Sequence, residues 1–396
     1  MNVKVLVADK FPEQYIKEMK ELNLDVNYSP KLGENDLPGE IKDTDILVVR
    51  STKVNAKTIE SAKNLNLIIR AGAGVNNINI SAANEKGIYV ANCPGMNSVA
   101  VAELAMGLMI SLDRRIPDNV MDFKNGKWNK GEYSKAQGLK GKTLGIIGYG
   151  AIGREVAKRA IAFDMKVYAK DISRIEGEMV KDFSEMDQLV PMCDILTIHL
   201  PATSDTKGLF NKEMFSYVKN NALIINTSRP DVIDEEALLE AIKEKNIRVA
   251  LDVFKGEPEV KTGEVKSSLQ DNPNIYVTHH IGASTEQAQN AVAAETVRVI
   301  KEYTSSGIIA HWVNRAKASD AKYQLVVKHF DKPGVLAGIL DVIRESNINI
   351  EEIENIIFEG GTAACCTMKL MGPASANMLK KMNENPNILS LSHVAI

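Results

Sequence analysis

The chain has 396 residues, more than one hydrophobic core usually organises, so we expect two or three domains. Hydrophobic residues make up 44% and charged residues 25%, a composition that excludes a mostly disordered chain. The formal net charge is −3 without a basic tract, which argues against nucleic acid as a partner. No apolar run approaches the roughly 20 residues of a membrane span, which argues against a membrane protein, and no signal peptide is evident.

Four apolar, strand-like runs occupy the first hundred residues, namely NVKVLVAD, DILVVR, LIIRAG and YVAN. A buried helix over residues 99–112 and an exposed arm over residues 124–137 are predicted next. Six further runs follow: TLGIIG, KVYAKD, DILTIHL, LIINTS, RVALDV and YVTHH. Because helix-like segments separate these runs, we expect parallel α/β architecture, with the six matching a doubly wound nucleotide-binding sheet.

A small, polar linker over residues 316–322 precedes a different pattern. Strands are predicted at 323–330, 349–358, 362–370 and 388–395, and helices at 334–345 and 374–383. This βαββαβ order is ferredoxin-like.

The four cysteines, Cys93, Cys193, Cys365 and Cys366, form no CxxC motif. They favour a reduced, cytoplasmic location over a disulfide or metal framework.

Gly148, Gly150 and Gly153 form G-x-G-x-x-G between a strand and a helix. The first permits a tight turn, the second lets backbone approach a pyrophosphate, and the third lets the helix pack on the strand. The helix start at Ala151 and Ile152 offers free N–H groups to the phosphates. Asp171 ends the next strand, where a carboxylate accepts from ribose hydroxyls, so we expect NAD rather than NADP.

Polar residues directly follow the other central strands, and these ends lie at one edge of a parallel sheet. Such a group suits hydride transfer beside a carboxylate. His280 is the expected base because its pKa lies near neutrality. Glu257 would orient that ring, and Arg229 would grip the carboxylate with two N–H bonds. His279 is a rival imidazole.

Five motifs, GYGAIG, HLPATSDTKGLFN, NTSRPDVIDEEAL, ALDVFKGEP and THHIGAST, together resemble the D-2-hydroxyacid dehydrogenase family. The resemblance implies that Arg229, Glu257 and His280 form the catalytic set. The sequence departs from the family pattern at Pro230, where the family usually has glycine, and at His279, where it usually has proline. The resemblance implies further cofactor contacts from Leu200, Pro201, Thr206, Thr227, Ser228, Asp252, Gly282 and Ala283.

The segments VVRSTKV, RAGAGVNNI and NCPGMNSVAVAE resemble the substrate lobe of D-3-phosphoglycerate dehydrogenases. This resemblance implies phosphate binding by Arg50 and Lys53, with hydrogen bonds from Ser51 and Asn97. The substrate carboxylate would meet backbone N–H groups of Ala73, Gly74 and Val75. Lys130 resembles a lysine that reaches the phosphate pocket of a neighbouring subunit.

The segment HFDKPGVLAGILDVIRESNINIEEI resembles the ACT domain, a small regulatory module that binds amino acids. In serine-regulated relatives the effector lies between two modules, which implies His329, Asp331 and Asn349 as effector residues here. Asp331 stands where those relatives often have an amide. The alternative is that the module only pairs subunits.

We therefore expect an α/β fold with two Rossmann-like, doubly wound lobes and a C-terminal ferredoxin-like ACT domain. The expected divisions are a substrate lobe (1–96, with a return at 284–315), an NAD-binding domain (97–283), a linker (316–322) and the ACT domain (323–396). The expected activity is NAD-dependent oxidation of 3-phospho-D-glycerate, the first step of L-serine biosynthesis, in a homodimer or homotetramer. The alternatives are a hydroxypyruvate, glyoxylate or D-lactate dehydrogenase, or a non-catalytic NAD-sensing scaffold.

Overall fold

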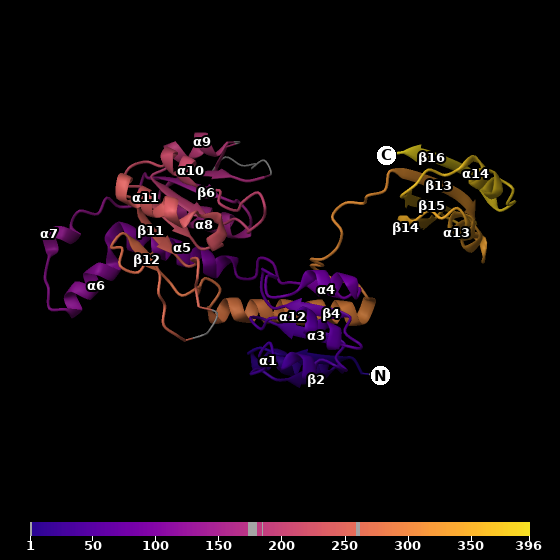
Figure 1. Ribbon diagram of the computed structural model, residues 1–396, viewed down its shortest axis with the longest axis horizontal. Helices are drawn as coiled ribbons and strands as arrows, with labels where there is room; N and C mark the ends of the chain where they lie inside the picture. The colour runs from indigo at the N-terminus through magenta and orange to yellow at the C-terminus, as the bar shows by residue number, and fades with distance from the viewer. Residues whose placement is uncertain (1, 173–179, 184, 259–261) are drawn as a thin grey trace. The chain divides into compact units, whose positions relative to one another are not determined.

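The computed structural model describes residues 2–172, 180–183, 185–258 and 262–396. The chain divides into two compact units, residues 1–314 and 315–396, which are described separately (Figure 1). Within the described ranges, no helix is long and apolar enough to cross a lipid bilayer.

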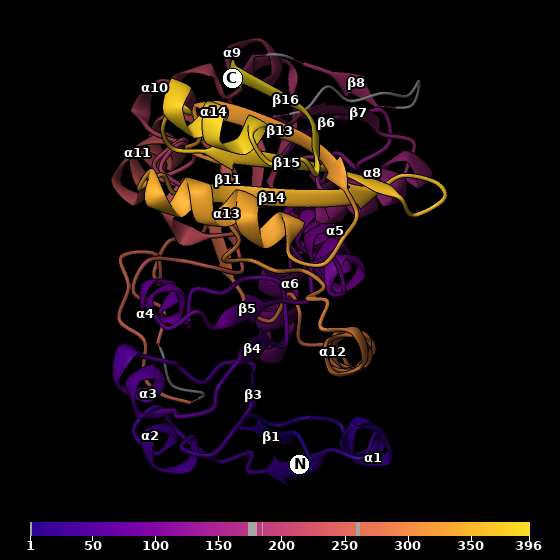
Figure 2. The ribbon, with the colours of Figure 1, turned by 90° about the vertical axis from the view of Figure 1, so that its right-hand side faces the viewer.

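The N-terminal lobe of the first unit is built on a five-stranded parallel sheet of order β2-β1-β3-β4-β5. Its strands are β1 (Lys4–Val7), β2 (Asp25–Tyr28), β3 (Ile46–Val49), β4 (Leu67–Arg70) and β5 (Tyr89–Ala91). Its helices are α1 (Glu13–Glu21), α2 (Leu37–Glu40), α3 (Ala56–Ser61), α4 (Ile80–Glu85) and α12 (Glu286–Ser306). Figure 2 shows α1 and α12 on one face of this sheet and α2, α3 and α4 on the other.

Alternation along the strands supplies both cores of this lobe. Val5 and Val7 pack with α1 and α12, whereas Leu6 points to the opposite face and packs with α2, α3 and α4. Because both faces are covered, a strand such as β3 is buried along its whole length. Helix α12 follows the central lobe in sequence, yet Val297 and Ile300 pack in the N-terminal lobe.

The central lobe contains a seven-stranded parallel sheet of order β12-β11-β10-β9-β6-β7-β8. Its strands are β6 (Thr143–Ile147), β7 (Lys166–Lys170), β8 (Lys181–Asp182), β9 (Ile195–Ile198), β10 (Leu223–Asn226), β11 (Arg248–Leu251) and β12 (Ile275–Val277). Its helices are α5 (Ser98–Arg114), α6 (Ile116–Lys124), α7 (Lys130–Tyr133), α8 (Ala151–Ala162), α9 (Met186–Leu189), η1 (Val190–Met192), α10 (Lys212–Tyr217), η2 (Pro230–Val232) and α11 (Glu235–Lys245). Helices α5 and α8 cover one face, and α10 and α11 cover the other.

Two strands were not predicted. The edge strand β2 reads DVNY with alternating exposed residues, and β8 has only the two polar residues Lys181 and Asp182. A strand with one neighbour and one covered face needs no continuous apolar run, so its sequence carries little signal. The expected count of six central strands is therefore wrong by one, although all six predicted runs form strands.

The second unit contains a four-stranded antiparallel sheet of order β14-β15-β13-β16. Its elements are β13 (Tyr323–Phe330), α13 (Val335–Glu345), β14 (Ile350–Ile357), β15 (Ala363–Leu370), α14 (Ala376–Asn383) and β16 (Ile388–Ala395). This succession confirms the predicted βαββαβ order. Both helices share one core with the two central strands.

Gly145, in the middle of β6, offers a test of this packing. A Cβ there would lie 2.5 Å from Cys193 Sγ and 2.9 Å from Leu196 Cδ2, both buried. Gly145→Ala should therefore destabilise the protein by about 1–3 kcal/mol, through overpacking, and lower the midpoint urea concentration of unfolding. The control is Gly39→Ala in α2, where a Cβ meets nothing within 4 Å. It should be neutral or stabilise by about 0.5–1 kcal/mol, so equal losses in both variants would contradict the packing argument.

Candidate active site

The three glycines after β6 have different surroundings. At Gly148, which has φ 96°, a Cβ would lie 2.6 Å from a backbone oxygen just beyond β9. At Gly153 a Cβ would overlap the backbone oxygen of Gly148, whereas at Gly150 it would meet nothing within 4 Å. The outer two glycines therefore permit close packing, and the middle one leaves the backbone open to a ligand. Helix α8 begins directly at Ala151 and Ile152, so free N–H groups at its start face that opening.

Asp171 lies beside this glycine turn at the end of β7. Its carboxylate accepts hydrogen bonds from the backbone N–H groups of Tyr149 and of Ile172, the latter at 2.7 Å. Lys170 donates to the backbone oxygen of Asp171 at 3.0 Å. A carboxylate in this position accepts from ribose hydroxyls and repels a 2′-phosphate, so the turn fits NAD.

The residues after β9 and β10 form the adjoining wall. Thr227 and Ser228 are buried directly after β10, and Leu200 and Pro201 follow β9. The Thr206 hydroxyl donates to the Pro201 carbonyl oxygen at 2.6 Å and thereby closes the loop between them. Contacts of these residues with a cofactor remain predictions.

His199, just beyond β9, is a structural residue. Burial lowers its pKa to about 3, so the ring is neutral. One ring nitrogen lies 2.9 Å from Thr197 Oγ1 and the other 3.5 Å from Thr227 Oγ1.

Asn226, the last residue of β10, was missed by the sequence analysis although its amide ends an apolar strand. Its Oδ1 accepts from the Ser228 N–H at 2.9 Å and from the Ser228 hydroxyl at 2.7 Å. Its Nδ2 donates to the Arg229 carbonyl oxygen at 3.0 Å. The buried amide therefore sets the backbone from which Arg229 projects. Pro230, the departure from the family pattern, begins the short helix η2.

The structure brings His280 and Glu257 together. His280 Nδ1 lies 2.9 Å from Glu257 Oε2, which leaves Nε2 as the other ring nitrogen. The hydrogen bond with Glu257 raises the pKa of His280 above its ordinary value, against an opposing effect of burial. His279, the rival imidazole, is exposed and has no hydrogen bond with any described residue. This geometry favours His280 as the proton acceptor.

Asp252 anchors the loop that carries His280. Its Oδ1 accepts from the Thr278 hydroxyl at 2.5 Å and the Ile281 N–H at 2.9 Å, and its Oδ2 accepts from the Gly282 N–H at 2.8 Å. The side chain is only 1% exposed. Asp252 therefore holds the backbone on both sides of His280, which has the left-handed φ of 51°. The predicted contact of Asp252 with the cofactor stays a prediction.

Arg229 reaches the N-terminal lobe at Gly74. A Cβ at Gly74 would lie 2.5 Å from Arg229 Nη2, so only glycine allows this approach. Among described residues, the backbone N–H groups of Ala73, Gly74 and Val75 have no hydrogen-bond acceptor within the chain. An acid group placed between Arg229 and this turn would meet a guanidinium on one side and free N–H groups on the other.

Arg70 is the functional candidate that the sequence analysis missed. It lines a cavity of about 150 Å³ together with Arg50, Asn97, His280 and Ala283. Burial, followed by the charges of Arg229 and Arg50, lowers the pKa of Arg70 to about 10. The available signal was its position at the end of β4, as the first residue of the quoted segment RAGAGVNNI. Three guanidinium groups therefore converge near one imidazole.

The loop after β3 is held by Asp9. Its carboxylate accepts from the backbone N–H groups of Arg50 at 2.6 Å, Ser51 at 3.0 Å and Thr52 at 3.0 Å. Burial alone would raise the pKa of Asp9, but these hydrogen bonds outweigh it and hold the pKa below the ordinary value. The Ser51 hydroxyl also donates to Asp9, at 2.8 Å. Ser51 is thus engaged as a donor within the chain, and its role as a substrate ligand stays a prediction.

The remaining substrate candidates are less constrained. Lys53 is exposed on the same loop, and Lys130 is exposed at the start of α7. The predicted contact of Lys130 with a neighbouring subunit is outside what a single chain shows.

The three effector candidates do not converge within one chain. His329 is buried near the end of β13, where its Nε2 lies 3.2 Å from Asn355 Oδ1. Asn349 precedes β14 at the opposite end of the sheet, beside Met371. Six residues of β15 separate the two positions, which is about 20 Å of strand. His329 and Asn349 therefore do not lie together at the start of α13 within a single chain. Asp331 is exposed at that start.

Glu257→Gln tests the pairing with His280. Because an amide carries no charge to stabilise the imidazolium, the pKa of His280 should fall, and the neutral ring should persist to lower pH. Proton NMR titration of the His280 ring measures this, with His280→Asn to assign the resonance. An unchanged pKa would show that the 2.9 Å contact does not persist in solution.

Comparisons with known proteins agree with this geometry. Residues 106–282 match the family described as D-isomer specific 2-hydroxyacid dehydrogenase, NAD binding domain. The chain is 43% identical over 297 residues to a hydroxypyruvate reductase of Thermotoga maritima, which covers 74% of this chain and 95% of that protein. It is 38% identical over 365 residues to a D-3-phosphoglycerate dehydrogenase of Methanocaldococcus jannaschii, covering 89% of this chain and 67% of that protein.

A solved structure gives the same result for the fold. The NAD-bound 3-phosphoglycerate dehydrogenase of Entamoeba histolytica superposes with a TM-score of 0.67 at 29% identity, over 80% of this chain and 99% of that chain. These similarities, over most of the chain, show that it belongs to the D-isomer-specific 2-hydroxyacid dehydrogenase family and is an NAD-dependent enzyme.

Proposed function

We propose that the enzyme oxidises 3-phospho-D-glycerate to 3-phosphohydroxypyruvate, the first step of L-serine biosynthesis. The observation that carries this proposal is the convergence of Arg50, Arg70 and Arg229 near His280. Asp9 offsets part of their mutual repulsion, and a bound anion would relieve the rest. A carboxylate alone needs one guanidinium, whereas a carboxylate and a phosphate on one substrate use all three.

Each end of this substrate has a matching place. Arg229 and the N–H groups of residues 73–75 hold the carboxylate. Arg50 and Arg70 hold the phosphate, with Lys10 at the rim of the same cavity. The Arg70 Nε donates to the Arg50 backbone oxygen at 3.1 Å, which holds the Arg70 guanidinium against the loop that carries Arg50.

The reacting hydroxyl lies between these ends. His280 accepts its proton at Nε2, because Nδ1 is occupied by Glu257. Glu257 stabilises the resulting imidazolium, and Asp252 keeps the ring in place through the loop backbone. Bound NAD supplies the carbon that accepts the hydride from the substrate. Both lobes contribute to the cavity, so their closure would exclude water from it.

Hydroxypyruvate reduction is the second candidate, favoured by the 43% identity to the Thermotoga maritima protein. That substrate has a carboxylate but no phosphate, so it would leave Arg50 and Arg70 without a partner of opposite charge. The same argument applies to glyoxylate and D-lactate. A non-catalytic NAD sensor would have no use for the pairing of His280 with Glu257.

The test compares NADH formation with 3-phospho-D-glycerate and with D-glycerate, its unphosphorylated counterpart. We expect kcat/KM for the phosphorylated acid to be higher by at least about a hundredfold, because losing two charged hydrogen bonds costs about 3 kcal/mol or more. Arg50→Gln should raise KM for 3-phospho-D-glycerate while changing kcat/KM for D-glycerate little. Lys57→Gln, an exposed lysine on α3 in the same lobe, is the matched control. Equal losses on both substrates would assign Arg50 a structural role and favour hydroxypyruvate reduction.

For the C-terminal unit we propose an ACT domain that binds L-serine between two copies of the chain. Its βαββαβ order and the segment HFDKPG support this. Since His329 and Asn349 lie at opposite ends of the sheet, a shared ligand would take His329 from one copy and Asn349 from the other. Under this proposal the enzyme is a homodimer through the central lobe or a homotetramer. The exposed side chains of Met121 and Phe123 in α6 and of Trp128 in the arm support such contacts between copies.

Serine inhibition tests the regulatory proposal. A chain ending at Ala318 should retain NADH formation and lose its response to L-serine, because the second unit contributes nothing to the catalytic set. Asn349→Ala should weaken inhibition in the full chain while uninhibited turnover stays near normal, with Asn377→Ala at an exposed position of α14 as the control. A coupling of about 1–3 kcal/mol allows inhibition to be partial. Absence of serine binding in calorimetry would contradict the proposal.

A further inference from the structure

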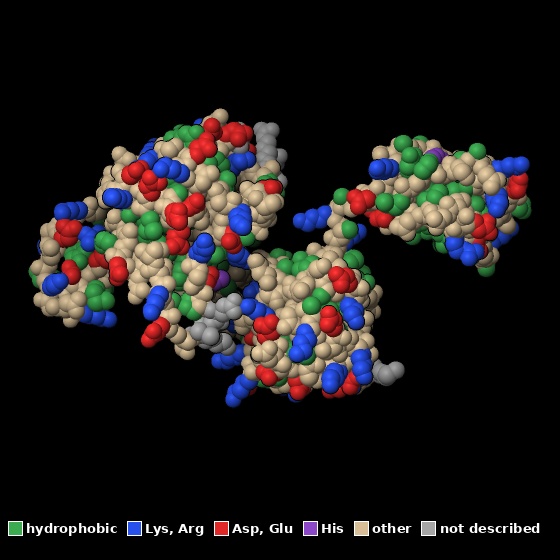
Figure 3. Space-filling view, in the orientation of Figure 1, with side chains coloured by type: hydrophobic (Ala, Val, Ile, Leu, Met, Phe, Trp, Pro, Cys, Tyr) green, Lys and Arg blue, Asp and Glu red, His purple; other side chains and the backbone are tan. Residues whose placement is uncertain are grey.

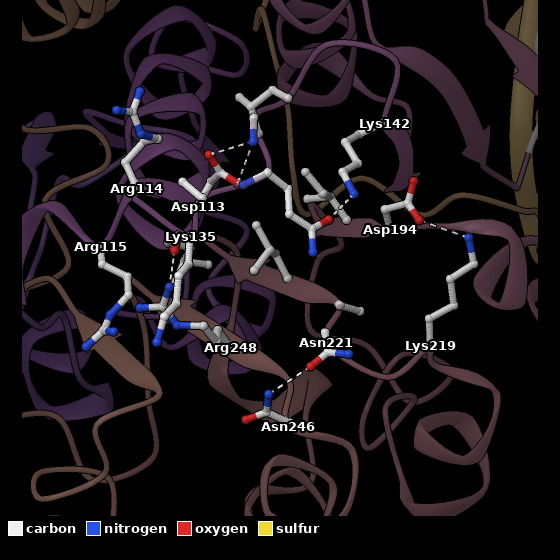
Figure 4. A pocket seen from close by; sticks show the side chains of 18 of the residues that line it. Asp113, Arg114, Arg115, Lys135, Lys142, Asp194, Lys219, Asn221, Asn246 and Arg248 are labelled. Atoms are coloured by element: carbon white, nitrogen blue, oxygen red, sulfur yellow. Dashed lines mark hydrogen bonds and ion pairs between the residues drawn. The ribbon is translucent and has the colours of Figure 1, made fainter. Parts of the chain in front are cut away.

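A second cavity of about 500 Å³ lies at the opposite edge of the central sheet from the catalytic residues (Figure 4). Its walls are the end of α5, the segment 132–142 at the end of the arm and beyond it, and the residues that begin β9, β10 and β11. The catalytic residues follow the other ends of these parallel strands. This basal cavity is therefore separate from the active site. Its volume is within the range of cavities that hold small metabolites.

Basic side chains outnumber acidic ones in its lining. The basic residues are Arg114, Arg115, Lys135, Lys142, Lys219 and Arg248, and the acidic residues are Asp113, Glu132 and Asp194. The whole chain has a net charge of −3, and on the face drawn in Figure 3 both signs are interspersed. The positive surplus is therefore local to the cavity, and a concave wall concentrates its field.

The three acids are already engaged. Asp113 accepts from the backbone N–H groups of Gln137 at 3.2 Å and of Gly138 at 3.0 Å. Asp194 accepts from the Thr143 N–H at 2.9 Å and from Lys219 at 3.0 Å.

The third acid, Glu132, is shared by two cations. It pairs with Arg115 and, at 2.6 Å, with Lys135. The three carboxylates of the lining therefore offset only part of the charge of its six basic groups.

Lys142 and Arg248 carry the unbalanced charge. Lys142 is half-buried, forms no ion pair among the described residues, and donates only to the Gln137 amide oxygen. Arg248 donates to the backbone oxygen of Leu112 and, at 2.8 Å, to the hydroxyl of Tyr276. Its Nη2 also forms a long ion pair, at 3.9 Å, with Asp118, a carboxylate that Arg115 shares at 2.9 Å. Figure 4 shows both side chains around the hollow, whereas Arg114 lies at the margin of the view.

Two asparagines complete the wall with oriented amides. Asn221 and Asn246 both have left-handed φ angles, 62° and 53°. Asn246 Nδ2 donates to Asn221 Oδ1 at 2.8 Å, which leaves the Asn221 amide N–H groups as donors beside the cations.

We propose that the basal cavity binds a small organic anion carrying two or more negative charges, such as a phosphorylated metabolite. The cation surplus and the amide donors match several acceptor oxygens on one ligand. A second copy of the arm is the less suitable occupant, because residues 124–137 contain four basic side chains and one acidic side chain. A bound anion would contact the end of α5, the segment 132–142 and the edge of the sheet, and would hold them together.

The experiment is calorimetric titration with pyrophosphate at constant ionic strength. The full-length Arg50→Gln/Arg229→Gln double variant, saturated with NAD so that the glycine turn is occupied, serves as background and removes anion binding at the active site. We expect saturable binding, and Lys142→Glu in this background should weaken it by about tenfold or more, through lost attraction and new repulsion. The control is Lys140→Glu, because Lys140 is exposed, pairs with Asp164 at 3.1 Å and does not line the cavity.

Asn246→Gly is the second variant, since glycine keeps the left-handed backbone and removes only the amide. It should also weaken pyrophosphate binding while leaving the thermal unfolding midpoint unchanged. Absence of saturable binding in the background variant, or an equal loss in the Lys140→Glu control, would overturn the proposal. A change of sedimentation coefficient on Lys142→Glu would also overturn it, because the cavity would then be an interface between copies.

Discussion

Repulsion among the guanidinium groups of Arg50, Arg70 and Arg229 is the constraint on which the rest of the site depends. Like charges held together in a partly buried cavity are costly, and the pKa of Arg70 is lowered first by burial and then by the charges of Arg229 and Arg50. The chain tolerates it because the surrounding backbone leaves room, most visibly at Gly74. Binding of an anionic substrate offsets the positive charge of these guanidinium groups, so the binding itself weakens the repulsion between them. This explains why two lobes with separate cores face each other across basic side chains.

Carboxylates hold the loops that bring these groups together. Asp9 collects three successive backbone N–H groups after β3, and Asp252 collects two on the loop around His280. Neither acid needs to touch the substrate in order to matter. Each carboxylate accepts hydrogen bonds from loop N–H groups that have no partner in a strand or helix. Because the acceptor is charged, these hydrogen bonds are stronger than those to a neutral acceptor. Rigid loops then place Arg50 and His280 without further reorganisation.

The central sheet uses its two edges differently. The carboxyl ends of its strands carry the glycine turn, Arg229 and the loop of His280, where the exclusion of water serves proton and hydride transfer. The opposite edge has a larger, more open group of cations whose acids are already paired. Because α5 spans from the active-site edge to this cavity, an anion bound there would act on the same rigid helix that begins after Asn97.

The sequence by itself determined the parallel α/β architecture, the βαββαβ order of the second unit and the group of Arg229, Glu257 and His280. These follow from local pattern: apolar runs of strand length, glycines at required spacing and polar residues directly after strands. The tertiary structure alone decided the role of Arg70, the engagement of Ser51 by Asp9 and the separation of His329 from Asn349. Those outcomes depend on which loops meet across about 20 to 40 intervening residues, and packing sets that, not local propensity. The strands β2 and β8 were not predicted from the sequence for a related reason. An edge strand is stabilised by its one neighbour rather than by its own composition.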